Sequence, residues 1–149
     1  MKYIIMITIV IGLAAADFVT GLLKACVKND VSSKTMRIGG IHKIAEIIVM
    51  AVACGLEIGL DMLGQYYSVG ADGETAEKLA AVSGMVASLL IFLYIVTMEL
   101  ISILENFSEI NPEAKWANWI VKKLRLFQQK EEEENGGKNV QGNGPDAAD

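Results

Sequence analysis

The stretch LAAVSGMVASLLIFLYIVTMELISIL, residues 79–104, is apolar almost throughout, and its only charged side chain is Glu99. A helix of this length rises about 39 Å, enough to cross about 30 Å of hydrocarbon. Residues 3–23 and 41–63 form two further apolar stretches of similar length. Three such stretches in 149 residues are difficult to bury in a water-soluble domain. The sequence therefore predicts an all-α integral membrane protein with three transmembrane helices over these ranges.

The charge of the chain is concentrated at its end. The net charge is −5, and residues 131–149 account for all of it, because this tail contains six acidic residues and one lysine. The remainder is balanced, so nucleic acid is not an expected partner. The tail has no apolar run, which is typical of a disordered, solvated acidic segment.

The composition gives little indication of a catalytic site or a metal site. The chain contains two cysteines, Cys26 and Cys54, and one histidine, His42. This is too few for a typical zinc ligand set, and a disulfide framework is not expected. Acids at helical spacing could act as general acids or bases, but no nucleophile or phosphate-binding loop accompanies them. We therefore expect no enzyme activity and no cofactor.

The distribution of lysine and arginine predicts the orientation of the three helices. Residues 24–43, predicted as a loop, and the segment after the third span are rich in basic residues, whereas residues 64–78 contain only Lys78. Basic segments stay on the cytoplasmic side. We therefore expect an outer N-terminus, an outer loop over 64–78 and a cytoplasmic C-terminus. An alternative is a signal peptide cleaved after Ala16, but the apolar run resumes directly at Phe18.

The second predicted span has two contrasting faces. At about 100° per residue, three acids share one stripe: Glu46, Glu57 and Asp61. Three small residues spaced by four share the opposite face: Ala51, Gly55 and Gly59. A carboxylate at the bilayer centre costs roughly 2.5–3.5 kcal/mol, whereas small residues allow helices to pack closely. The pattern predicts a pore-lining stripe and a packing face, although Glu46 and Asp61 could equally be interfacial.

A second set of polar residues lies near the cytoplasmic ends of the outer two spans. Asp17 and Glu99 lie at similar distances inside these ends, so they are expected at one depth. Ser102 and Asn106 share the helical face of Glu99. The sequence predicts one polar layer, which is either a structural clasp or part of a gate: Asp17, Lys24, Lys43, Glu99, Ser102 and Asn106.

Residues 111–130 combine aromatic and aliphatic side chains with several lysines. This pattern predicts a basic amphipathic helix on the cytoplasmic membrane surface. The alternative is a short helix that packs on the segment 24–43. Together, the prediction is a transmembrane domain over 1–110, this helix over 111–130, and the tail over 131–149.

Two stretches resemble the toxin-secretion/phage-lysis holin family. DFVTGLLKACVKNDVSSK (17–34), followed by GGIHK (39–43), is similar to one family segment, and MELISILENF (98–107) is similar to another. The family motif positions in this chain are Asp17, Thr20, Gly21, Lys24, Ser32, Ser33, Lys34, Glu99, Ser102, Glu105 and Asn106. After the second segment the chain has SEINPE, with one proline, where the family usually has a glycine and two prolines.

The resemblance implies a phage-encoded protein that oligomerises in the bacterial cytoplasmic membrane and opens timed lesions. An endolysin, or in some relatives a toxin, leaves through them. The implied partners are membrane lipid, further copies of the chain, and the released protein. One alternative is a non-pore anchor or accessory subunit that docks a soluble partner. A proton- or cation-coupled transporter is a third reading, disfavoured because no inverted repeat or broken helix is evident.

Overall fold

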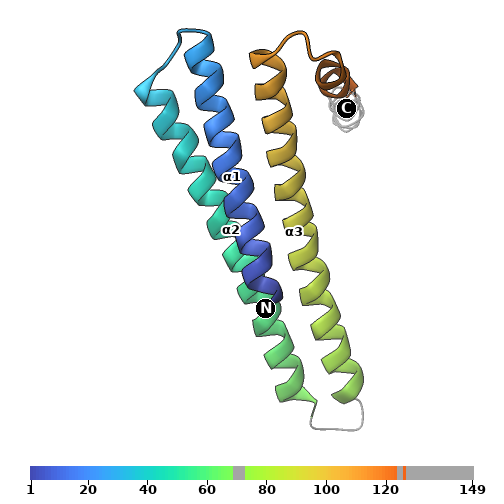
Figure 1. The fold of residues 1–149 in the computed structure, drawn as a ribbon. Helices are drawn as coiled ribbons and strands as arrows, with labels where there is room; N and C mark the ends of the chain where they lie inside the picture. Colours follow the sequence, from blue (N-terminus) through green and yellow to red (C-terminus); the bar gives the residue numbers. More distant parts are fainter. Residues whose placement is uncertain (69–72, 124–125, 127–149) are drawn as a thin grey trace, which may run out of the picture.

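The computed structural model of the chain describes residues 1–68, 73–123 and 126. Three long helices follow one another: α1 (Lys2–Val27), α2 (Ser33–Tyr67) and α3 (Gly73–Ile110). Figure 1 shows them side by side, with the α1–α2 turn and the end of α3 at the same end of the bundle. All three are long and apolar enough to cross a membrane, and the described residues contain no strand. The all-α prediction with three apolar helices is therefore confirmed.

The helices extend beyond the apolar stretches that predicted them. Residues 24–43 were expected to form a loop, but only 28–32 lie outside helices, and the helices also include 64–67 and 73–78. The reason is that apolarity predicts the part of a helix that lipid can surround, whereas lysine, arginine and methionine continue a helix readily in water. The bilayer boundaries along these helices remain a prediction.

A tight turn sets α2 beside α1. Asn29 has a positive φ of 52°, a conformation that asparagine tolerates better than most residues. The N–H of Asp30 donates to the carbonyl of Ala25 at 3.0 Å, which closes the end of α1 in the manner of a Schellman motif. Ser32 then caps α2 by accepting from the N–H of Thr35 at 3.5 Å. Because the turn is short, a residue of α1 lies beside the residue of α2 that is about the same number of positions from the turn.

The centre of the bundle is a small apolar core. Its buried residues are Val10 from α1, Met50, Ala53 and Cys54 from α2, and Ile95 from α3. Most other large apolar side chains point outward along all three helices, as expected for surfaces that face lipid. The same arrangement in water would leave long apolar faces exposed.

Small residues on α3 allow it to approach α2 closely. A Cβ atom at Gly84 would lie 3.0 Å from the Cα of Glu57, and one at Gly64 would lie 3.0 Å from the Cβ of Ala80. Ala80, Gly84 and Ser88 are spaced by four residues, so they form one row along α3. This row was not among the predicted packing residues, and it serves packing within the chain.

The packing face predicted on α2 points away from the bundle. A Cβ atom at Gly55 or Gly59 would meet nothing within 4 Å, and Ala51 is exposed. This face is therefore not used within the chain and is open to a neighbouring molecule.

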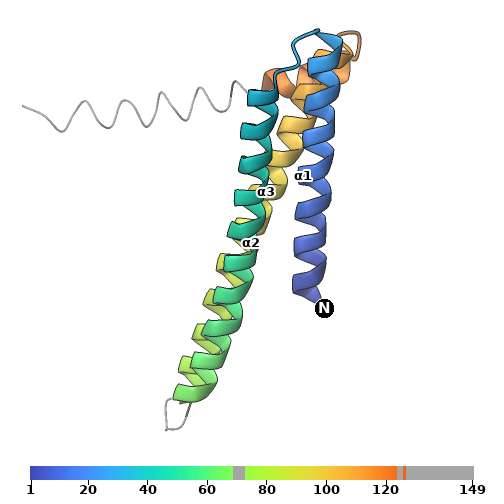
Figure 2. The ribbon, with the colours of Figure 1, turned by 90° about the vertical axis from the view of Figure 1, so that its left-hand side faces the viewer.

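A short helix over 115–123 crosses the end of the bundle near the α1–α2 turn (Figure 2). It begins four residues later than expected, because 111–114 form a turn, and the rest of the predicted range lies mostly outside the described residues. Ala117 and Val121 are buried, whereas Trp116 and Trp119 are more than half exposed. The predicted acidic tail over 131–149 also lies outside the described residues.

Candidate functional site: polar clusters inside the helix bundle

The first cluster surrounds the ammonium group of Lys43 and joins all three helices. Lys43 Nζ lies 2.8 Å from Asp17 Oδ2 of α1, 2.7 Å from Glu99 Oε2 of α3 and 3.5 Å from Glu46 Oε2 of α2. Glu99 is 1% exposed and Asp17 7% exposed. We call these four side chains the Lys43 cluster. One ammonium here faces three carboxyl groups, so the cluster would carry an excess of two negative charges if all were ionised.

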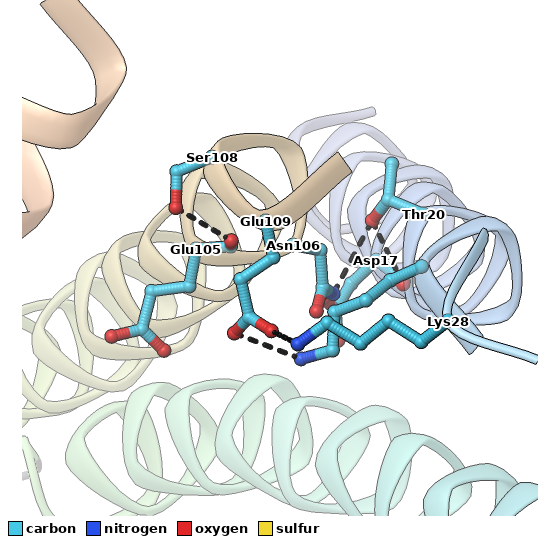
Figure 3. A network of polar contacts seen from close by, with 8 residues as sticks. Asp17, Thr20, Lys28, Glu105, Asn106, Ser108 and Glu109 are labelled. Atoms are coloured by element: carbon cyan, nitrogen blue, oxygen red, sulfur yellow. Dashed lines mark hydrogen bonds and ion pairs between the residues drawn. The ribbon is translucent and has the colours of Figure 1, made fainter. Parts of the chain in front are cut away.

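Asp17 is held from its other side by Asn106, which ties α1 to the end of α3. Asn106 Nδ2 donates to Asp17 Oδ1 at 2.9 Å and lies 3.4 Å from Thr20 Oγ1. The Thr20 hydroxyl donates to the backbone carbonyl of Asp17 at 3.0 Å. Figure 3 shows Asn106 turned toward Asp17. Both carboxylate oxygens of Asp17 therefore have a partner.

A second cluster lies closer to the α1–α2 turn, where Glu109 of α3 meets Lys24 of α1 and Lys28, the residue directly after α1. Lys24 Nζ lies 3.3 Å from Glu109 Oε1, and Lys28 contacts the other oxygen of the same carboxylate (Figure 3). These side chains are between one third and one half exposed, so each pair stabilises the bundle by about 0–1 kcal/mol. Either Lys24 or Lys43 of the predicted polar layer could have paired with Asp17 and Glu99; Lys43 contacts both acids, and Lys24 contacts Glu109.

A third cluster lies farther along the bundle, toward the α2–α3 connection. Glu57 of α2 is 4% exposed, contacts the ammonium of Lys2, and accepts from the Ser88 hydroxyl of α3 at 2.5 Å. We call these three side chains the Glu57 cluster. As in the Lys43 cluster, residues from three helices surround a buried carboxylate.

The three acids of the predicted stripe do not form one group. Glu46 belongs to the Lys43 cluster, Glu57 has its own partners, and Asp61 is exposed and accepts from the amide of Gln65 at 3.2 Å. They lie on one side of α2, as the helical spacing requires, but each acid has different partners. Ser102, assigned to the predicted polar layer, is half-buried and makes no hydrogen bond to these clusters within the described residues.

The two buried clusters lie at opposite ends of the apolar core. Fourteen residues of α2 separate Lys43 from Glu57, a rise of about 21 Å. The hydrocarbon region of a bilayer is about 30 Å thick. At least one cluster must therefore lie within the hydrocarbon if the bundle crosses a membrane. Charged groups at that depth need partners or protonation. Both clusters place partners beside their buried carboxyl groups.

Sequence reasoning missed four of the participating residues: Lys2, Lys28, Ser88 and Glu109. Ser88 precedes Glu99 by eleven residues, about three helical turns, so its position on the same face could have been recognised. Glu109 follows Asn106 by three residues and continues its face in the same way. Lys2 has no comparable signal, because its contact with Glu57 depends on how α1 lies against α2.

A cavity of about 320 Å³ lies beside the Lys43 cluster. Asp17, Lys43 and Asn106 line its inner part, and Lys24, Lys28 and Asp30 line it near the α1–α2 turn. It therefore links Asp17 and Lys43 to the end of the bundle. Among the described residues, no group of His, Cys, Asp and Glu side chains is arranged to hold a metal ion.

The fold and its clusters define a small three-helix membrane protein whose internal charges are enclosed by partners. A family model for the bacteriophage holin family matches residues 2–129, and the chain belongs to this family. The match confirms the resemblance seen in the motifs around Asp17 and Glu99. No curated protein and no solved structure matches the chain.

Proposed function

We propose that this holin oligomerises in the bacterial cytoplasmic membrane and forms timed lesions that release an endolysin or a toxin. The observation that carries the proposal is the contrast between the two sides of α2. Glu57 is enclosed by partners of the same chain, and Glu46 is half-buried and paired with Lys43. The face of Ala51, Gly55 and Gly59 has no neighbour within the chain. A single chain can therefore accumulate in lipid, and it retains a close-packing surface for further copies.

The enclosed carboxylates suggest how an assembly would open. Glu57 is held between Lys2 of α1 and Ser88 of α3, so it can reach water only if these helices separate from α2. In the proposed lesion, the helices of each subunit lose contacts with one another and form contacts with helices of neighbouring subunits. The stripe of Glu46, Glu57 and Asp61 then faces an aqueous opening. The Asp17–Asn106 contacts and the Lys43 cluster hold the closed form together.

The C-terminal region fits an orientation with the N-terminus outside and the C-terminus in the cytoplasm. The helix over 115–123 exposes Trp116 and Trp119 and contains Lys115, Lys122 and Lys123. Exposed aromatic rings beside lysines are typical of a helix on an anionic membrane surface. We propose that this helix rests on the cytoplasmic leaflet and that residues 1–110 form the transmembrane domain.

The test is to express the full chain alone in a bacterium and to follow membrane potential, viability and release of a co-expressed cytoplasmic endolysin. We expect a silent period, then an abrupt loss of potential and release of the endolysin. The competing function is an anchor that docks a soluble partner without forming a lesion. A chain that inserts in the membrane at high level and leaves the potential unchanged would support the anchor and contradict the proposal.

Replacing the enclosed carboxylate tests the pore-lining role. We expect Glu57→Leu to insert normally and to delay the loss of potential by several-fold, because an apolar side chain gives no hydration energy to an aqueous opening. Glu74→Leu is the matched control, since Glu74 is an exposed acid near the start of α3 that lies outside the proposed stripe and should leave the timing unchanged. Unchanged timing for Glu57→Leu at normal membrane levels would rule out the pore-lining assignment of Glu57.

A further inference from the structure

The Lys43 cluster contains two buried oxygen atoms that lack a hydrogen-bond partner. Glu46 Oε2 and Glu99 Oε1 are the two buried side-chain polar atoms without a hydrogen bond in the described part of the chain. Both belong to carboxyl groups that face the same ammonium: Lys43 Nζ lies 2.7 Å from Glu99 Oε2 and 3.5 Å from Glu46 Oε2, the latter an ion pair without a hydrogen bond. The Glu99 side chain is almost completely enclosed, with 1% exposure. Buried polar atoms are rarely left unpaired, so this pair needs an explanation.

The other groups around the pair do not supply the missing partner. Lys43 is the one cation of the cluster and already contacts Asp17, Glu46 and Glu99. Asp17 is itself a carboxyl group, and its second oxygen accepts from Asn106. The nearest lysines toward the turn, Lys24 and Lys28, are bound to Glu109.

Ionised carboxylates only accept hydrogen bonds, so two of them cannot bond to each other. One hydrogen between them converts one oxygen into a donor and gives the facing oxygen a hydrogen to accept. It also reduces the excess negative charge of the cluster from two to one. Buried carboxyl groups in apolar surroundings neutralise themselves in this way when cations are insufficient.

We propose that Glu46 and Glu99 form a proton-binding site in which one proton, taken from water, is shared between the two carboxyl groups. The hydroxyl of one carboxyl donates to the unpaired oxygen of the other, while Lys43 contacts both groups. This assignment concerns the closed chain itself and does not depend on lesion formation.

The cavity beside the cluster reaches Asp17 and Lys43, and Lys43 contacts both carboxyl groups of the site. Lys43 and Asp17 line its inner part, and Lys28 and Asp30 line it close to the α1–α2 turn. The Glu46 side chain is itself about one-third exposed, with a relative accessibility of 34%, so a proton can exchange without separating the helices. Because the cluster joins α1, α2 and α3, occupancy of the site alters how strongly the three helices hold together.

Infrared spectroscopy of the purified full-length chain in lipid vesicles tests the site directly. The carbonyl stretch of a protonated carboxyl group is separate from the bands of a carboxylate. We expect this band near neutral pH, shifted by deuterium exchange, and absent from both Glu99→Gln and Glu46→Gln. Glu74→Gln is the matched control, because Glu74 lies in an exposed pair with Lys78 and should leave the band unchanged.

The outcomes separate the proposal from its competitors. A spectrum without a protonated carboxyl band near neutral pH overturns the site. A band that survives Glu46→Gln but not Glu99→Gln places the proton on Glu99 alone and overturns the sharing. Carboxylate bands that shift with sodium concentration, with no protonated band, would show a metal cation in place of the proton. Circular dichroism confirms that each variant retains its helix content, so a missing band is not the result of misfolding.

Discussion

Replacing Lys43 by methionine lowers the free energy of unfolding of the bundle by about 3–5 kcal/mol, the usual cost of leaving a buried charge without its partner. The ammonium of Lys43 contacts Asp17, Glu46 and Glu99 at once, so the substitution removes a contact from every helix. The methionine side chain is similar in length to that of lysine. The change in the free energy of unfolding therefore reflects the loss of the charge more than a loss of side-chain volume. Denaturation of the purified chain in mixed micelles, followed by circular dichroism, measures the change.

Lys78→Met is the matched control, since Lys78 forms an exposed pair with Glu74 that is worth about 0–1 kcal/mol at most. The Lys43→Met defect should also shrink as the pH is lowered, because protonation removes the unbalanced charge of the carboxyl groups. A loss below about 1 kcal/mol at neutral pH would mean that Lys43 does not neutralise this cluster.

The double substitution Gly55→Leu with Gly59→Leu should weaken self-association at least about tenfold, or about 1.4 kcal/mol, and abolish timed lysis. A Cβ atom at either glycine meets nothing within the chain, so the monomer can accept both leucines. A second helix that packs on this face would be pushed outward by the added side chains. Chemical crosslinking in membranes and lysis timing measure the two effects.

Gly12→Leu is the matched control for this pair. Gly12 lies on α1, where an added Cβ atom also meets nothing within 4 Å, so the substitution adds a similar apolar volume to a different outer face. Equal loss of crosslinking in the control and in the double variant would indicate a general effect of bulk. Normal crosslinking and timing in the double variant would exclude this face of α2 as the oligomer contact.

The number of helices and their central segments could be predicted from the sequence, because apolarity determines them. Three long apolar stretches predict three helices, because each is too long and too uniform for another arrangement. Their ends were less predictable, since the basic residues after Leu23 and the residues from Ser33 to Lys43 continue helices that lipid need not surround. The turn at Asn29 is what brings Lys43 to the level of Asp17.

The polar contacts were only partly predictable. Helical spacing placed Glu99 and Asn106 on one face and suggested a layer with Asp17, and the structure brings these residues together through Lys43 and direct contact. Spacing within one helix does not determine which lysine reaches which acid, because the axial offset between helices sets that choice. Lys24 therefore contacts Glu109 and not Asp17. Of the two partners of Glu57, Ser88 shares the helical face of Glu99, whereas no pattern in the sequence indicated Lys2.

The two cysteines give the chain a built-in chemical probe. Cys54 is buried in the apolar core, less than one turn before Glu57, whereas Cys26 is exposed near the end of α1. A water-soluble thiol reagent can reach Cys26 in the closed chain but has no path to Cys54. Alkylation of Cys54 would therefore record the moment at which α1 and α3 part from α2.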